Sequence, residues 1–187
     1  VVAFTTDQMK AMGTSQIAAL TKLQMPSFSG EQLAAIDSSD MPSLSLAAVT
    51  AITGGQIAQL TTAQVSKLSS AQIAAIATTS IDDLTAEQIL GLTSSQVRSL
   101  TASQIANLTV DQVKALDPAE DIAAFGTAGI KAMTSVQIGA LTSAEAAQIS
   151  VAQIAQISAD NLAKMAVDTA SALSTSAVRA INATQLA

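Results

Sequence analysis

The sequence predicts an all-α fold, a compact α-solenoid of about 23 very short helices, and three observations support this prediction. A large apolar residue recurs every eight residues along the 187-residue chain. A Ser, Thr, Asp, Asn or Gly follows that residue in 21 of the 23 repeats, and a Gln stands three residues later in 14 of them. Finally, most acidic residues lie near the start of a repeat and most basic residues lie near its end.

The apolar residue that opens each eight-residue repeat, or octad, is called the anchor below. The anchors run without a slip from Phe4 to Leu116 and, after one inserted residue, from Phe125 to Ile181. A second apolar position lies five residues after each anchor, and all six Met and all three Phe occupy one of the two positions. These positions predict the core, in a single continuous solenoid over 1–187 with a one-residue frame shift between 117 and 125.

The polar pair in each octad predicts where a helix begins. A hydroxyl followed three residues later by Gln, as in Thr101 and Gln104, is a capping box. The hydroxyl accepts a hydrogen bond from the third helical amide, while the Gln side chain accepts one from the capping residue's own amide. Because the box recurs in register, each octad predicts one capped helix of roughly one and a half turns.

The charges test this frame independently. Acids are stabilised in the first turn of a helix and bases in the last turn. Seven of the eight basic residues lie six or seven residues after an anchor, Lys22 being the exception. Most of the 14 acids lie in the predicted first turn, whereas Asp82 and Asp83 do not.

Helices this short are stable only when they stack on their neighbours, which favours a solenoid. One continuous helix is rejected, because an eight-residue period drifts by about 80° per repeat and keeps no apolar face. A β-solenoid is the alternative fold. Against it, anchor and second position are five residues apart, so they would lie on opposite faces of a strand.

Several octads depart from the pattern. Pro26 and Pro42 each remove a helical hydrogen bond, so their octads are expected to be loosened. The stretch 117–120 reads as a strong helix start, and the inserted residue predicts a helix there that is one residue longer. The box is missing at Ala77/Ser80, Gly126/Gly129 and Ala166/Thr169.

Composition excludes several functions. The chain has no Cys and no His, so thiol or imidazole catalysis and the usual zinc sites are ruled out. A net charge of −6 and only three aromatic residues argue against nucleic-acid binding. The acid groups at 37/40, 82/83/87 and 117/120/121 lack the alternation of a calcium loop. We therefore expect no enzymatic activity, no cofactor and no metal, and the polar uncharged stretch 41–66 is not a membrane span.

The L-T-x-x-Q-[IV]-x-x octads, such as LTASQIAN from Leu100, resemble the degenerate repeat arrays of large secreted or surface proteins of Gram-negative bacteria, of adhesin or biofilm-matrix type. The resemblance covers nearly the whole chain. It implies a non-enzymatic structural protein outside the cell or on its surface, either a solenoid spacer or a self-assembling fibre subunit. The alternative function is a binding module that recognises a protein or glycan through its outward-facing positions.

Self-association is the expected partnership, with other surface proteins or glycans as further partners. An uncovered solenoid face exposes core side chains that a neighbouring repeat would bury, and such patches mark interaction sites. The candidate residues for end-to-end contact are Phe4 and Met9 on one side and Ile181 and Leu186 on the other. A head-to-tail contact of this kind need not close into a ring and can continue as a filament.

Overall fold

The computed structural model describes residues 4–118 and 120–186, and within them all regular secondary structure is helical. The elements are α1 (Thr6–Lys10), α2 (Thr14–Ala18), η1 (Met25–Ser27), α3 (Gly30–Ala34), η2 (Ser38–Ser43), α4 (Leu46–Thr50), α5 (Gly54–Ile57), α6 (Thr62–Lys67), α7 (Ser70–Ala75), α8 (Ala86–Leu90), α9 (Ser94–Ser99), α10 (Ala102–Asn107), α11 (Val110–Lys114), α12 (Asp121–Ala124), α13 (Gly126–Ala132), α14 (Ser135–Ala140), α15 (Ser143–Ala147), α16 (Val151–Ile154), α17 (Ala159–Leu162), α18 (Val167–Ser171), α19 (Thr175–Ala180) and η3 (Ala183–Gln185), where η marks a 3₁₀ helix. The predicted all-α solenoid is confirmed, and the β-solenoid alternative is wrong for the residues described.

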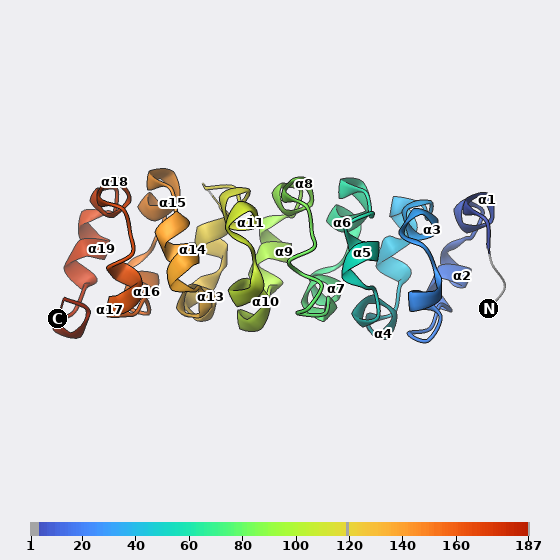
Figure 1. Ribbon diagram of the computed structural model, residues 1–187, viewed down its shortest axis with the longest axis horizontal. Coiled ribbons are helices and arrows are strands. Elements are labelled where there is room, and N and C mark those ends of the chain that lie inside the picture. The colour runs from blue at the N-terminus through green and yellow to red at the C-terminus, as the bar shows by residue number, and fades with distance from the viewer. Residues whose placement is uncertain (1–3, 119, 187) are drawn as a thin grey trace. The chain divides into compact units, whose positions relative to one another are not determined.

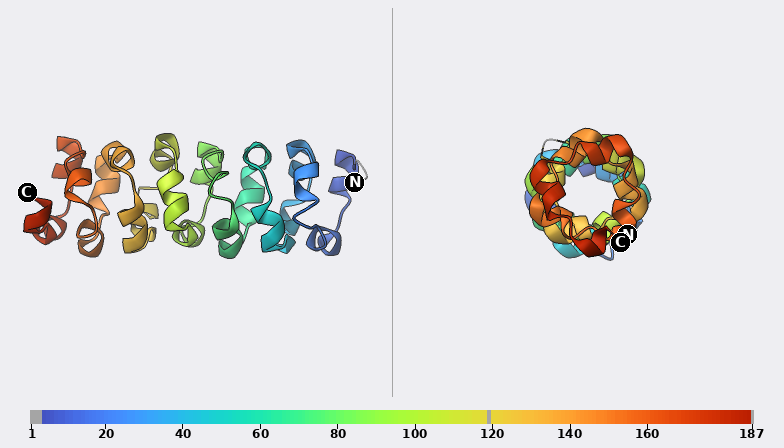
Figure 2. Two further views of the ribbon diagram at one scale, coloured as in Figure 1. Left: turned by 60° about the horizontal axis from the view of Figure 1, so that its bottom comes forward. Right: turned by 90° about the vertical axis from the view of Figure 1, so that its left-hand side faces the viewer.

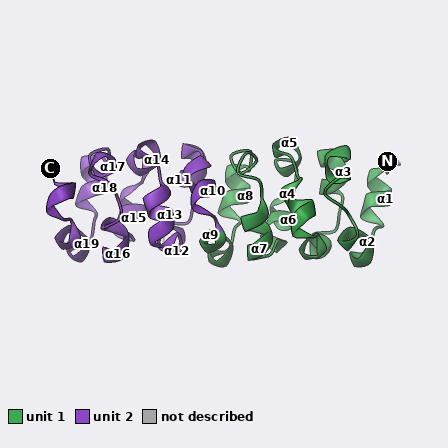
Figure 3. Cartoon of the chain, turned by 90° about the horizontal axis from the view of Figure 1, so that it is seen from below, with its two compact units in different colours: residues 1–99 green, residues 100–187 purple. Residues whose placement is uncertain are grey.

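The chain forms two compact units, residues 1–99 and 100–187 (Figure 3). In unit 1 the helices follow one another around a coil, and each packs on the element three octads further along, as α4 does on α7 and η2 does on α6 (Figure 1). In unit 2 the same spacing pairs α10 with α13, α14 with α17 and α16 with α19. Figure 2 shows the coil of short helices in each unit from two further directions.

The helices begin where the capping boxes predict. Thr61, for example, has an extended backbone, its hydroxyl accepts from the Gln64 amide at 3.1 Å, and Gln64 Oε1 accepts from the Thr61 amide at 2.9 Å. Complete boxes of this kind open most helices of both units. The capping residues with both bonds present include Thr5, Ser29, Ser69, Thr85, Thr101, Thr109, Thr134, Thr142 and Ser150.

Replacing Thr101 by Ala is expected to lower the free energy of unfolding by about 1 kcal/mol, because the Gln104 amide loses its hydroxyl acceptor, which lies 3.2 Å away. Urea unfolding followed by circular dichroism measures the change. Ala102→Ser is the matched control, since Ala102 is exposed in the first turn of the same helix. Equal stability of the two variants would show that the Thr101 cap contributes nothing.

The core consists of the two apolar positions of each octad. Across both units most anchors and second positions are buried, with Ile57, Ile73, Ile89 and Ile138 at 0% exposure. Many links between helices are short and extended, because the anchor just before the next cap has an extended backbone; Leu68, for example, has φ −59° and ψ 139°. The anchor of each octad is thus buried between the helix of its own octad and the adjacent helices of the same unit.

The octads with Pro26 and Pro42 are loosened, as predicted. Both prolines lie in 3₁₀ helices, η1 and η2, instead of in an α-helix. This is the conformation expected where a missing amide prevents the longer-range α-helical bond. The octad from Ile76, which lacks the capping box, forms turns and no helix.

The prediction of a longer helix at the frame shift is wrong. The helix α12 has only four residues and begins at Asp121, and it runs into α13 without an extended link because Phe125 is itself helical. Gly126 follows with φ +63°, a left-handed conformation that a residue with a side chain rarely adopts. The inserted residue is therefore accommodated where α12 meets α13. At this junction a direct connection between the two helices takes the place of a capped helix start.

Candidate self-association site

The recurrent Gln of the capping box has a second partner in the preceding turn of the coil. Gln64 Nε2 donates to the Leu33 carbonyl at 2.9 Å and to the Ile36 carbonyl at 2.8 Å, which lie 31 and 28 residues earlier. The first acceptor is a second-position residue and the other is an anchor. The same Gln therefore caps the start of its own helix and satisfies carbonyls at the end of an earlier one.

This contact repeats as a series that we call the glutamine ladder. Its donors reach carbonyls 28 and 31 residues earlier, at 2.6–3.0 Å, so one turn of the coil takes between three and four octads. Across the frame shift the separations become 32 and 29 for Gln137, and the bonds remain 2.7 Å long. The members include Gln32, which donates to the Phe4 carbonyl 28 residues earlier, together with Gln56, Gln64, Gln72, Gln88, Gln96, Gln137, Gln153 and Gln185.

Sequence reasoning assigned these residues to capping alone and missed the ladder. Most ladder glutamines are buried; Gln64 and Gln72 are 1% exposed. The sequence did contain a signal for the ladder, namely the recurrence of Gln at a position where Glu would cap the helix equally well. A capping box accepts Glu as readily as Gln, whereas only the amide carries a donor for a second contact.

Shorter side chains maintain part of the ladder where the Gln is absent. Ser80 donates to the Ile52 carbonyl, Asn161 to the Met133 carbonyl and Thr169 to the Leu141 carbonyl, each 28 residues earlier. These side chains reach only the anchor carbonyl. The octads from Ile76 and Met165, which lack the box, thus still connect to the preceding turn of the coil.

Glu145 is the exception that shows what the amide contributes. Its Oε2 accepts from the Thr142 amide at 2.6 Å, so the cap is intact. Its Oε1 is buried and has no hydrogen-bond partner, although the residue is only 1% exposed. The register of Gln137, one octad earlier, directs this position toward backbone carbonyls. An ionised carboxylate cannot donate to them.

In the first coil turn of unit 1 the corresponding glutamines show the capping contact alone, because positions 28 and 31 residues before them precede residue 1 of the sequence. Gln8, Gln16 and Gln24 use Oε1 to accept from the amides of Thr5, Gly13 and Thr21 at 2.8, 3.0 and 2.8 Å. Among the described residues no acceptor lies within reach of their Nε2 atoms. Gln8 and Gln16 are exposed, in contrast to the buried ladder glutamines.

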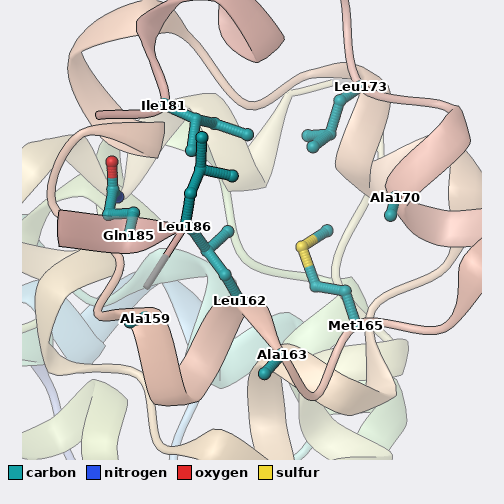
Figure 4. A pocket seen from close by; sticks show the side chains of 9 residues that line it. All are labelled: Ala159, Leu162, Ala163, Met165, Ala170, Leu173, Ile181, Gln185 and Leu186. Atoms are coloured by element: carbon teal, nitrogen blue, oxygen red, sulfur yellow. The ribbon is translucent and has the colours of Figure 1, made fainter. Parts of the chain in front are cut away.

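The last coil turn of unit 2, residues 158–186, surrounds an apolar hollow of about 310 Å³. Its lining includes Leu162, Met165, Leu173 and Leu186, whose side chains border the space in Figure 4. Leu162 and Met165 are half-buried, whereas most earlier core residues are almost inaccessible.

The four predicted contact residues differ in accessibility. Leu186 is 75% exposed at the hollow, and Ile181 is half-buried in its lining. Phe4 is half-buried and stacks near Phe28 with ring centroids 6.3 Å apart. Met9 is 0% exposed, so it belongs to the core of its own coil turn and offers no surface for contact.

The acid groups contribute to caps and to the frame shift. The Ser39 amide and hydroxyl, both hydrogen-bonded to Asp37, lower the pKa of that carboxyl. Burial raises the pKa of the Asp121 carboxyl, against the hydrogen bond from the Asp117 amide, which lowers it. In the part of the chain that the structure describes, no group of three or more acidic side chains is placed to hold a metal ion.

A helical repeat protein is the class that this fold and ladder define. Residues 119–151 match the family model of the ALTTAQ repeat. No curated protein and no solved structure matches the chain significantly. Of the helices described, none is long and apolar enough to cross a membrane.

Proposed function

We propose that the chain is a non-enzymatic structural protein, a solenoid spacer or fibre subunit that acts outside a bacterial cell or on its surface. The observation that carries this proposal is the glutamine ladder. It commits the recurrent Gln of the repeat to joining turns of the coil, and its acceptors are backbone carbonyls that every octad offers. The recurrent side chain of each octad therefore acts to hold one turn of the coil on the preceding turn.

The extracellular setting rests on the sequence. The octads resemble the arrays of secreted and surface proteins, the family match to the ALTTAQ repeat covers residues 119–151, and the chain contains no Cys and few Lys. Hydrogen bonds from a repeated side chain to backbone carbonyls suit a scaffold role. They form with the residues of the repeat alone and require no cofactor.

Electron microscopy of purified chain over a range of concentrations tests this function. We expect ordered filaments or strings that lengthen as concentration rises, because association through repeat faces continues without closing. A chain that remains as single particles at every concentration, and that binds one protein or glycan saturably, would overturn the proposal in favour of a binding module.

A further inference from the structure

The peptide bond between Asp117 and Pro118 carries a nucleophile on one side and a good leaving group on the other. Asp117 is the one Asp of the sequence that a Pro follows. Its side-chain carboxylate can close a small cyclic anhydride on the carbonyl carbon of its own residue. The Pro118 nitrogen belongs to a tertiary amide without a hydrogen, which makes it more basic than other peptide nitrogens. Both residues are exposed, so water reaches the bond.

The carbonyl group of this bond is polarised by two main-chain amides. The Asp117 carbonyl oxygen accepts from the Glu120 amide at 3.3 Å and from the Asp121 amide at 3.0 Å. Negative charge that develops on this oxygen during attack would meet both donors already in place, as in an oxyanion hole. Because both amides belong to the turn that leads into α12, the fold positions them before the reaction begins.

A buried carboxyl lies beside the main chain of the same bond. Asp121 Oδ2 accepts from the Asp117 amide at 2.8 Å, and Asp121 is only 3% exposed. Burial raises the pKa of this carboxyl, and the charges of Asp117 and Glu120 raise it further, against the hydrogen bond from the Asp117 amide. Asp121 can therefore hold a proton after exposed carboxyls have lost theirs, within one residue of the nitrogen that needs it.

We propose that the folded chain cleaves its own Asp117–Pro118 bond. The Asp117 carboxylate forms a bond to its own carbonyl carbon, and the carbonyl electron pair moves onto the oxygen that the two amides hold. As that pair returns, the bond to the Pro118 nitrogen breaks, and the nitrogen takes the proton of Asp121. The products are a cyclic anhydride at Asp117 and a segment that begins with the free secondary amine of Pro118.

Water is the co-reactant that completes the reaction. It opens the anhydride to the two carboxyl groups of a C-terminal Asp117, and their protons pass to the Asp121 carboxylate and to the new amine. Each chain reacts once, so this is a processing step and not the turnover of a separate substrate. It would divide the array where the octad frame shifts, and it goes beyond the proposed structural function without depending on it.

The chain contains a matched Asp that lacks the leaving group. Asp37 also opens a helical turn, and its carbonyl accepts from the Asp40 amide at 3.0 Å. The next residue is Ser38, whose nitrogen belongs to an ordinary secondary amide. The amide and hydroxyl of Ser39 both donate to the Asp37 carboxylate at 2.8 Å. We therefore expect no cleavage after Asp37 under conditions that cleave after Asp117.

Incubation of the purified chain between about pH 4 and pH 7, followed by mass spectrometry of the intact products, tests the reaction. The expected fragments are 1–117 and 118–187, formed at a rate that does not depend on chain concentration. Added hydroxylamine should capture the anhydride as a hydroxamate on Asp117. The same chain unfolded in urea should cleave about a hundredfold more slowly, because it lacks the aligned amides and the proton donor.

Three substitutions separate the roles of the groups. Asp117→Ser keeps a capping hydroxyl but removes the nucleophile, and Pro118→Ala removes the leaving group, so each should reduce cleavage to background. Asp121→Asn keeps an oxygen for the Asp117 amide but has no proton to transfer. In the natural chain the rate should rise as pH falls through the titration of Asp121, above the usual range of a carboxyl. Asp121→Asn should lose the rise in that range, and circular dichroism checks that each variant stays helical.

Equal rates in the folded and the urea-unfolded natural chain would overturn the proposal, because the bond would then show only the lability of any Asp–Pro sequence. Cleavage that persists in Asp117→Ser, or that is absent from the natural chain, would overturn it as well. An unchanged pH profile in Asp121→Asn would overturn the role of Asp121 as proton donor. Filament formation is measured separately on the uncleaved Asp117→Ser chain, so this proposal and the structural function fail independently.

Discussion

Replacing Gln64 by Glu should lower the free energy of unfolding by about 3 kcal/mol, because the Leu33 and Ile36 carbonyls lose their side-chain donor inside a buried contact. The substitution preserves the shape of the side chain and leaves an oxygen to cap Thr61. It therefore separates the ladder from the cap. Urea unfolding monitored by circular dichroism measures the loss, and an unchanged dependence on urea would show that the unfolded state is not altered.

Gln8→Glu is the control for this experiment. Gln8 has the same place in its octad and the same cap, with Oε1 2.8 Å from the Thr5 amide, but it is exposed and donates to no described carbonyl. Its substitution should change stability by less than about 0.5 kcal/mol. If Gln64→Glu were as mild as Gln8→Glu, the buried donor bonds would not be what stabilises the stacking of coil turns.

Replacing Glu145 by Gln should raise the free energy of unfolding by about 1–2 kcal/mol, because the unpartnered Oε1 becomes an amide nitrogen that donates to the carbonyls of the preceding coil turn. The oxygen that accepts from the Thr142 amide is retained. The expected change in the free energy of unfolding has the opposite sign from that of Gln64→Glu at the equivalent position of its octad. The two variants together therefore test whether an amide donor at this position stabilises the coil.

Glu87→Gln is the control for the charge change. Glu87 lies in the first turn of α8 and is exposed, so the loss of its charge should leave stability nearly unaltered or slightly reduced. A gain in both variants would point to the net charge of −6 as the cause. Destabilisation by Glu145→Gln would show that the ladder register does not hold at this octad.

The sequence predicts the parts of this fold that depend on local contacts. Thr61 and Gln64 are three residues apart, and their mutual hydrogen bonds require nothing beyond the start of one helix. For the same reason the prolines at 26 and 42 predict loosened octads, and both octads form 3₁₀ helices. Period, caps and core are each encoded within eight residues.

What the sequence does not predict depends on the pitch of the coil. The partners of Gln64 Nε2 lie 28 and 31 residues away, and nothing within one octad specifies that separation. The buried state of Met9 depends likewise on how its coil turn closes, which is why it is a core residue and not a contact residue. At the frame shift, the left-handed Gly126 permits a junction that propensity alone does not indicate.

The acceptors of the ladder are main-chain carbonyls, and this has a consequence for how such a gene can change. A donor at one octad recognises the backbone of whichever octad lies one coil turn earlier, regardless of its side chains. Duplication or loss of eight codons therefore exchanges one set of equivalent carbonyls for another and leaves every remaining Gln with partners. Gln137 shows that one added residue, which breaks the eight-residue register, is also accommodated. Its two bonds span one residue more than those of the other ladder glutamines and are still 2.7 Å long. Changes in the number of octads are therefore expected to preserve the hydrogen bonds that join the turns of the coil.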